Sequence, residues 1–309
     1  MVQTLPGRQI ERPLVLGKGW LEIGLGVDRK VATGAWGPMG QPVEWEPGTR
    51  FTYDTHRMDL RYGLSRRVEL TAQLKTHWVE WEQPGAAADL EQFGIGDPRF
   101  GVVFEAFRAQ GPLTSLVFVG NIKGAAANES PGDIDGDPST FSRFVMTTGT
   151  SDLELGVRGK HQLGPMAITL DAAGVYRSSD VTQYMADPQH PGFNQRIQPG
   201  SLGRVGAELL LQLGPVACSG GAVLTARSAT RVGSTAPGLF PARNLRVLDG
   251  SEGIAVDARA ATIVHLSRRI DAIVGVQVPM LGEDWMYFPI EDLHPTRGTT
   301  TSATLALRH

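Results

Sequence analysis

The sequence of 309 residues contains no long hydrophobic run. Its apolar stretches are short, as at Leu116-Val117-Phe118-Val119, whereas a membrane-spanning helix needs about 18–20 mostly apolar residues. A helical membrane protein is therefore excluded. A membrane β-barrel is not excluded, because each of its strands needs only about 9–11 residues and half of them can be polar.

The sequence also has little cysteine and no excess of positive charge. Cys218 is the single cysteine, so no disulfide can form within the chain. The formal net charge is -3, whereas nucleic-acid binders usually carry a basic excess, so no nucleic-acid partner is expected. Residues 1–7 lack the basic region and apolar core of a signal peptide. If the chain is an exported barrel, we expect its export signal to have been removed.

The sequence is instead rich in period-two alternation and in glycine, with 38 glycines and 20 prolines. In residues 20–28, Leu, Ile, Leu and Val alternate with polar residues and glycine. A helix would scatter these two sets, but a strand places them on opposite faces. Clear alternation predicts strands at Trp20–Asp28, Val68–Trp78, Ser151–His161, Met166–Arg177, Arg204–Leu213 and Ile254–His265. Weaker alternation predicts strands at Thr52–Tyr62, Arg99–Phe107, Thr114–Lys123, Val216–Ala226, Ala272–Val278 and Thr301–His309.

The connections between these strands alternate in length. Short ones fall near Gly63–Arg66, Arg108–Pro112, Gln162–Pro165, Gly214–Pro215 and Leu266–Arg269. Long ones fall near Gly34–Arg50, Glu82–Gly94, Gly124–Gly149, Ser178–Gly200, Arg227–Gly253 and Pro279–Thr300. Outer-membrane barrels have short periplasmic turns and long extracellular loops. We therefore predict an all-β, antiparallel up-and-down barrel of about twelve strands in the outer membrane of a Gram-negative bacterium. Residues 1–18 would be a periplasmic N-terminal segment and residues 19–309 the barrel.

A soluble all-β protein would also show alternation, with its apolar faces turned to a core. Two further features favour the membrane. The expected strands are about 9–11 residues long, whereas strands in soluble sheets average about 5–6. Tyr62, Trp78 and Tyr176 stand at strand ends on the apolar face, where an interfacial aromatic girdle would lie.

Three segments resemble a known family. The hairpin Leu60–Leu70 and the strand openings Gly94–Gly101 and Gly149–Gly156 resemble those of the transporter-like barrel family labelled "MetA-pathway of phenol degradation". The resemblance runs from about Gly19 to the C-terminus. It implies an outer-membrane channel, with small aromatic compounds as candidate solutes, and brings no catalytic motif.

The polar faces of the strands supply the candidate site, because they would line the lumen. The candidate lumen-lining residues are Glu69, Lys75, Glu105, Asp152, Glu154, Arg158, Asp171, Arg204, Glu208, Asp257 and Arg259. Their charges are nearly balanced, so strong selectivity for anions or cations is not expected. Two functions stay open: a channel for passive passage of small solutes, with hydrophobic or aromatic compounds as candidates, or a non-conducting structural barrel in a cell-envelope assembly. The expected partners are the lipid bilayer, small solutes and, through the long loops, envelope proteins.

Other chemistry has little support. Asp133, Asp135 and Asp137 could chelate Ca²⁺, although the spacing fails the EF-hand pattern and a solvated acidic loop is the simpler interpretation. Calcium is the one cofactor considered. The histidines show no zinc-binding spacing. Ser219 and His265 could meet across strands, but such pairs are usually incidental, so we do not expect an enzyme.

Overall fold

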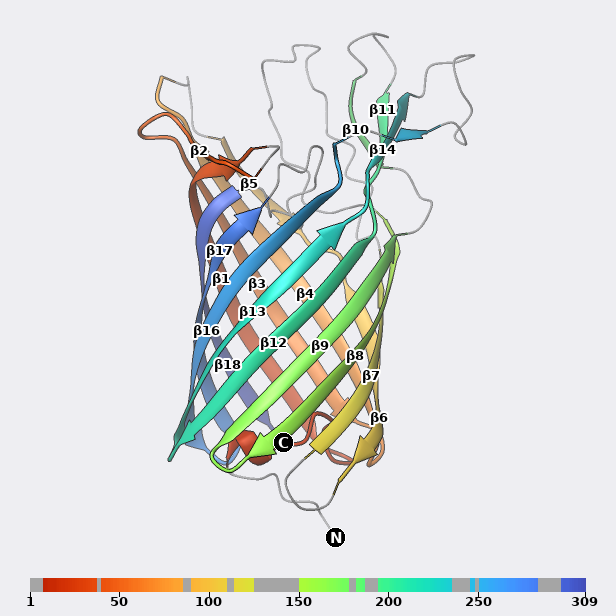
Figure 1. Ribbon diagram of the computed structural model, residues 1–309, viewed down its shortest axis with the longest axis vertical. Coiled ribbons are helices and arrows are strands. Elements are labelled where there is room, and N and C mark those ends of the chain that lie inside the picture. Colours follow the sequence, from red (N-terminus) through yellow and green to blue (C-terminus); the bar gives the residue numbers. More distant parts are fainter. Residues whose placement is uncertain are drawn as a thin grey trace.

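In the computed structural model, twelve long antiparallel strands form a sheet that closes into a barrel (Figure 1). The structure describes residues 8–37, 40–85, 90–109, 114–124, 150–177, 182–186, 194–234, 245–247, 250–282 and 296–309. Strand β18 (Thr296–Arg308) closes the barrel by pairing with β1 (Leu21–Trp36), from the pair Glu22–Arg308 to the pair Ala35–Thr296. The predicted up-and-down barrel of twelve strands is therefore confirmed.

The other wall strands follow one another in sequence order around the barrel. They are β3 (Arg50–Gly63), β4 (Val68–Glu82), β6 (Arg99–Arg108), β7 (Thr114–Lys123), β8 (Asp152–Leu163), β9 (Met166–Arg177), β12 (Leu202–Leu213), β13 (Val216–Arg227), β16 (Gly253–Ser267) and β17 (Ile270–Gly282). The short strands β2 (Pro42–Glu44) and β5 (Leu90–Ile95) pair with β1 and β4. A separate small sheet contains β10 (Thr182–Ala186), β11 (Asn194–Gln198), β14 (Arg231–Ser234) and β15 (Arg246–Val247).

Several strands are longer than the sequence pattern predicted. β1 has 16 residues and β4 has 15, and both continue past the predicted ends at Asp28 and Trp78 toward the long-loop end (Figure 1). Beyond the bilayer neither face meets lipid, so the alternation that marks a strand fades there. For the same reason the small sheet and β5 lie within segments predicted to be loops. The short turns and the C-terminal residue lie together at the opposite end.

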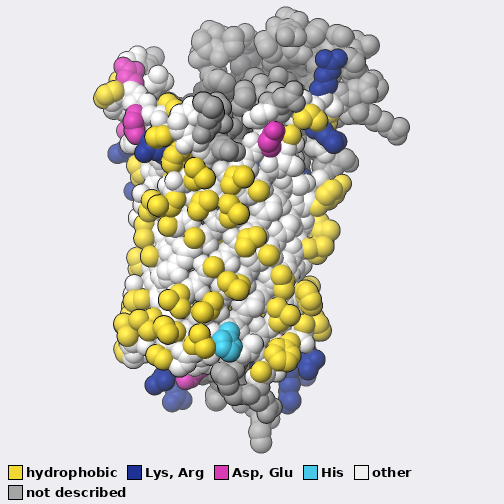
Figure 2. All heavy atoms as spheres, in the orientation of Figure 1, with side chains coloured by type: hydrophobic (Ala, Val, Ile, Leu, Met, Phe, Trp, Pro, Cys, Tyr) yellow, Lys and Arg dark blue, Asp and Glu magenta, His cyan; other side chains and the backbone are white. Residues whose placement is uncertain are grey.

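The outer wall is apolar. Leu70, Leu155, Ile168 and Leu209 are 40%, 60%, 38% and 46% exposed, and hydrophobic side chains cover the visible wall while most charges lie near its two ends (Figure 2). Exposed leucines over a continuous sheet are what a lipid-facing surface requires. None of the residues that the structure describes belongs to a helix long and apolar enough to cross a bilayer.

The inner wall is polar, and small residues make room on it for long charged side chains. A Cβ atom at Gly26 would lie 2.8 Å from Arg57 Nε. Glycine therefore lets Arg57 lie across β1, where its Nη1 reaches Asp28 Oδ2 at 2.9 Å and its Nη2 donates to Thr304 Oγ1 at 2.8 Å. The lumen, rather than a conventional hydrophobic core, thus contains the candidate site.

Candidate site in the barrel lumen

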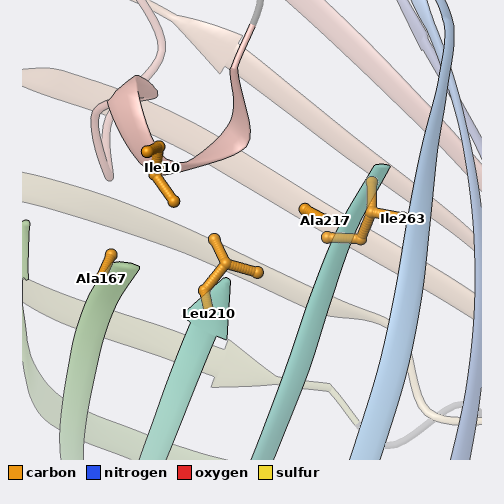
Figure 3. Close-up of a cluster of buried hydrophobic side chains, with 5 residues drawn as sticks. All are labelled: Ile10, Ala167, Leu210, Ala217 and Ile263. Carbon is orange, nitrogen blue, oxygen red and sulfur yellow. The ribbon is translucent and has the colours of Figure 1, made fainter. Parts of the chain in front are cut away.

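A short segment ahead of β1 enters the lumen at the short-turn end. It contains the 3₁₀-helix η1 (Gln9–Glu11), which positions Ile10 inside the barrel mouth (Figure 3). Ile10 is 1% exposed, and its side chain belongs to a buried cluster with Ala167, Leu210, Ala217 and Ile263. We call residues 9–16 the plug segment. The sequence pattern predicted only a periplasmic segment at residues 1–18, and it contained no sign that residues 9–16 are buried in the barrel.

Buried charges hold the plug segment from one side. The carboxylate of Asp271 accepts hydrogen bonds from Arg12 and from Arg308 Nη1, the latter at 2.6 Å. His265 Nδ1 lies 2.7 Å from the other carboxylate oxygen. Arg308 also pairs with Glu22. Asp271 is almost fully buried, so it needs these partners to offset its loss of hydration.

The row of ion pairs continues around the wall through Arg61. Its Nη1 lies 2.9 Å from Glu22 Oε1 and its Nε lies 2.7 Å from Glu69 Oε1. Glu69 in turn accepts a hydrogen bond from the backbone N–H of Leu16 at 2.7 Å, and Arg61 donates to the carbonyl of Leu14 at 3.2 Å. The row therefore binds the plug segment at Arg12, Leu14 and Leu16.

The wall formed by β8 and β12 holds the same segment through its backbone. Lys160 Nζ donates to the carbonyl oxygens of Gln9 at 3.1 Å and Arg12 at 2.9 Å. Gln212 Oε1 accepts a hydrogen bond from the backbone N–H of Gln9 at 2.9 Å. With contacts on both sides, the plug segment is fixed across the lumen.

The lumen beyond the plug segment contains two adjoining cavities. The lower cavity, beside the plug segment, has a volume of about 740 Å³, and the upper cavity, nearer the long loops, has a volume of about 570 Å³. Six residues line both cavities, and we call them the central belt: Arg57, Gln73, Asp171, Glu208, Arg259 and Ser302. Within the described part of the chain, Asp171, Glu208 and Arg259 have no ion-pair partner, so their charges face the cavities.

Most of the residues predicted to line the lumen border these cavities. They are Glu69, Lys75, Glu154, Arg158, Asp171, Arg204, Glu208, Asp257 and Arg259. Glu105 and Asp152 do not line either cavity. Each is buried in an ion pair, with Arg108 at 2.7 Å and Lys123 at 3.0 Å respectively. Alternation gives the face on which a side chain lies, but not whether a neighbour covers it.

An aromatic cluster lies on the lumen face of β3 and β4 near the long-loop end. Tyr53 stacks on His77 at 5.3 Å between ring centroids and lies 6.5 Å from Phe51. Trp81 packs edge-on against Phe51 at 6.0 Å and lies 4.9 Å from Trp45. The Tyr53 hydroxyl is 2.8 Å from His77 Nδ1, and both residues line the upper cavity. The sequence analysis did not identify this cluster, although its members on β3 and β4 occupy the same face of each strand as the polar residues.

The other predicted sites are not assembled among the described residues. Asp133, Asp135 and Asp137 lie outside those residues, so the calcium site stays a prediction. No group of three or more His, Cys, Asp or Glu side chains in the described ranges is arranged to hold a metal ion. Ser219 faces Ala261 in the strand register, whereas His265 contacts Asp271. The structure therefore does not bring Ser219 and His265 together.

Comparison with known proteins rests on structure alone. No protein-family model matches the sequence, and no curated protein matches it. The COG4313 outer membrane channel from Pseudomonas putida F1 matches with a TM-score of 0.70 and 11% identity, over 96% of this chain and 97% of that one. The NanC porin matches with a TM-score of 0.46 and 7% identity, over 92% of this chain and 98% of that one. The TodX monoaromatic hydrocarbon channel matches with a TM-score of 0.44 and 8% identity, over 95% of this chain and 90% of that one. The fold is thus that of an outer-membrane barrel, as the family resemblance implied.

Proposed function

We propose that the chain is a passive outer-membrane channel for small solutes with a hydrophobic or aromatic part, closed at its periplasmic end by its own plug segment. The observation that carries the proposal is the pair of adjoining cavities, because a structural barrel has no need of an unfilled interior. A lumen of this size suits small molecules, since ligand cavities commonly span about 300–1,000 Å³.

The aromatic cluster supports the choice of solute. Tyr53 borders the upper cavity and stacks on the buried ring of His77, and Trp81 and Trp45 continue the cluster toward the long-loop end. Aromatic side chains bind flat apolar groups by stacking, at about 0.5–1.5 kcal/mol beyond burial for each favourable pair. A solute entering from outside would meet these rings before the charged central belt.

The central belt supports a weakly selective path. Arg57 and Arg259 are matched there by Asp171 and Glu208. A balanced ring of charges favours neither small cations nor small anions strongly. Uncharged solutes with a polar group could exchange water for these side chains as they pass.

Single-channel recording in a planar bilayer tests the proposal. We expect phenol, added on the long-loop side, to interrupt the ion current, and cyclohexanol of similar size to do so less. Tyr53→Ala should weaken the effect of phenol, whereas Tyr176→Ala, which removes an exposed outer-wall ring, should not. If neither the wild type nor a variant with a loosened plug segment conducts, the structural-barrel alternative is favoured instead.

A further inference from the structure

The short-turn end contains two kinds of turn with different sequences. The β8–β9 and β12–β13 turns pass through Gly164-Pro165 and Gly214-Pro215, where the glycines have φ values of 61° and 62°. Only glycine adopts this backbone region without strain. These turns carry no charge. The β3–β4 and β16–β17 turns instead share the sequence Leu-Ser-Arg-Arg, at residues 64–67 and 266–269.

The serine of each Leu-Ser-Arg-Arg turn fixes the arginines in place. Ser65 Oγ accepts a hydrogen bond from the backbone N–H of Arg67 at 3.2 Å. Ser267 Oγ accepts the same bond from Arg269, also at 3.2 Å. The two turns therefore share this serine hydrogen bond, although they differ in length: residues 64–67 separate β3 from β4, whereas only residues 268–269 separate β16 from β17.

The arginines of both turns are exposed and unpaired. Arg66, Arg67, Arg268 and Arg269 all lie on the surface, and none has an ion-pair partner among the residues that the structure describes. Lys18 is also exposed and lies between the turns, because Gly19 bonds to Gly63 at the base of the β3–β4 turn.

We call Lys18, Arg66, Arg67, Arg268 and Arg269 together the basic arc. It extends over the consecutive wall strands from β16 through β18 and β1 to β4, and Lys and Arg side chains are visible at the lower rim (Figure 2). The remaining described turns, with Gly164 and Gly214, are neutral. Among the short turns that the structure describes, basic residues are thus concentrated on the side of the barrel formed by β16 to β4.

The basic arc lies at the edge of the apolar wall. Leu64 and Leu266, directly before each Ser-Arg-Arg, are 50% and 61% exposed. Tyr62, two residues before Leu64 on the outer face, is 43% exposed. The arginines therefore begin where the lipid-facing surface ends, at the level of lipid headgroups. The guanidinium group binds phosphate oxygens through two parallel hydrogen bonds.

We propose that the basic arc binds the phosphate headgroups of anionic phospholipids in the leaflet around the short-turn end. Clusters of basic residues beside membrane-spanning segments attract anionic lipid. The exposed leucines would contact the acyl chains while the arginines contact the phosphates. Anionic lipid would then gather beside the β18–β1 seam, where the chain leaves the plug segment, and not beside the neutral turns. The inference does not depend on which solute the lumen carries.

Native mass spectrometry of the full chain, released from nanodiscs of equal phosphatidylglycerol and phosphatidylcholine, tests the proposal. We expect phosphatidylglycerol to be enriched among the retained lipids, with roughly a five-fold gain in affinity for each basic residue near the anionic surface. High salt should reduce the enrichment, because exposed charges are screened.

The matched variants decide the outcome. Arg66→Gln, Arg67→Gln, Arg268→Gln and Arg269→Gln together should abolish the enrichment, and either turn alone should lower it in part. Arg231→Gln with Arg246→Gln, at the long-loop end, should leave it unchanged. Enrichment that survives the fourfold variant would overturn the proposal. So would a wild type without enrichment, which would leave the arc as a surface for an acidic periplasmic protein.

Discussion

The ammonium nitrogen of Lys160 lies 2.9 Å from the backbone carbonyl oxygen of Arg12, whose side chain pairs with Asp271. Lys160 belongs to β8 and Asp271 to β17, and these strands are not neighbours in the sheet. Arg12 therefore connects two separate parts of the wall, one through its backbone and one through its guanidinium. Removing either connection should loosen the plug segment without touching the strand pairing.

Lys160→Met should open the channel more often. The change removes two hydrogen bonds from a charged donor, each contributing about 1.5–3 kcal/mol, and leaves a side chain of similar length. We expect a higher open probability in single-channel recordings. Lys75→Met, which removes a charge from the upper cavity away from the plug segment, is the control. Equal open probabilities in the wild type and Lys160→Met would show that the plug segment does not limit the current.

Arg158→Ala with Arg259→Ala should shift the channel toward cations. Both arginines line the lower cavity without an ion-pair partner in the described ranges, so Asp171 and Glu208 would remain as uncompensated charges. The measurement is the reversal potential across a salt gradient. Asp171→Asn with Glu208→Gln should move it in the opposite direction. A shift of the same sign in both double variants would contradict the role of these lumen charges.

Leu209→Arg should destabilise the barrel according to its depth. Leu209 is 46% exposed on the outer wall in the body of β12, and an arginine near the bilayer midplane costs about 2–4 kcal/mol. Leu163→Arg, at the end of β8, should cost only about 0–1 kcal/mol because it lies near the interface. Urea unfolding in lipid vesicles measures both. Similar losses at the two positions would argue against the assigned membrane span.

Lys123→Met should destabilise the long-loop end. Lys123 Nζ lies 2.9 Å from Asp97 Oδ2 and 3.0 Å from Asp152 Oδ2, and all three side chains are buried. Removing one partner of a buried ion pair costs about 3–5 kcal/mol, because a buried charge stays uncompensated. The drop in melting temperature should be much smaller for Lys123→Arg, which keeps the charge. If Lys123→Met melts like the wild type, water must reach the two carboxylates.

The barrel itself could be predicted from the sequence, because lipid on one face and water on the other impose a period of two on every strand. The same pattern placed Lys75, Asp171 and Arg259 on the lumen face. It could not identify their partners, since pairing depends on register and on side-chain reach. Asp152 is an example, because it lies on the lumen face of its strand and yet is buried against Lys123.

The plug segment could not be predicted for a different physical reason. Residues 9–16 form only one short 3₁₀-helix and have no periodicity of their own. Their position is set by contacts distant in sequence, such as Arg12 with Asp271, 259 residues apart. The aromatic cluster was not predicted because Phe51 and Tyr53 lie on the polar face of β3, and the alternation of this strand is irregular.

The pairing of β1 with β18 also sets the order in which the molecule assembles. The plug segment pairs through Arg12 with Asp271 on β17. Asp271 also pairs with Arg308 on β18, and Arg308 pairs with Glu22 on β1. Their site exists only after the first and last strands have met. Because closing a loop over nearly the whole chain costs conformational entropy, we expect the plug segment to dock on β17 only after the barrel has closed. Plug docking is then a late folding step, and a nascent barrel passes through a transiently open form.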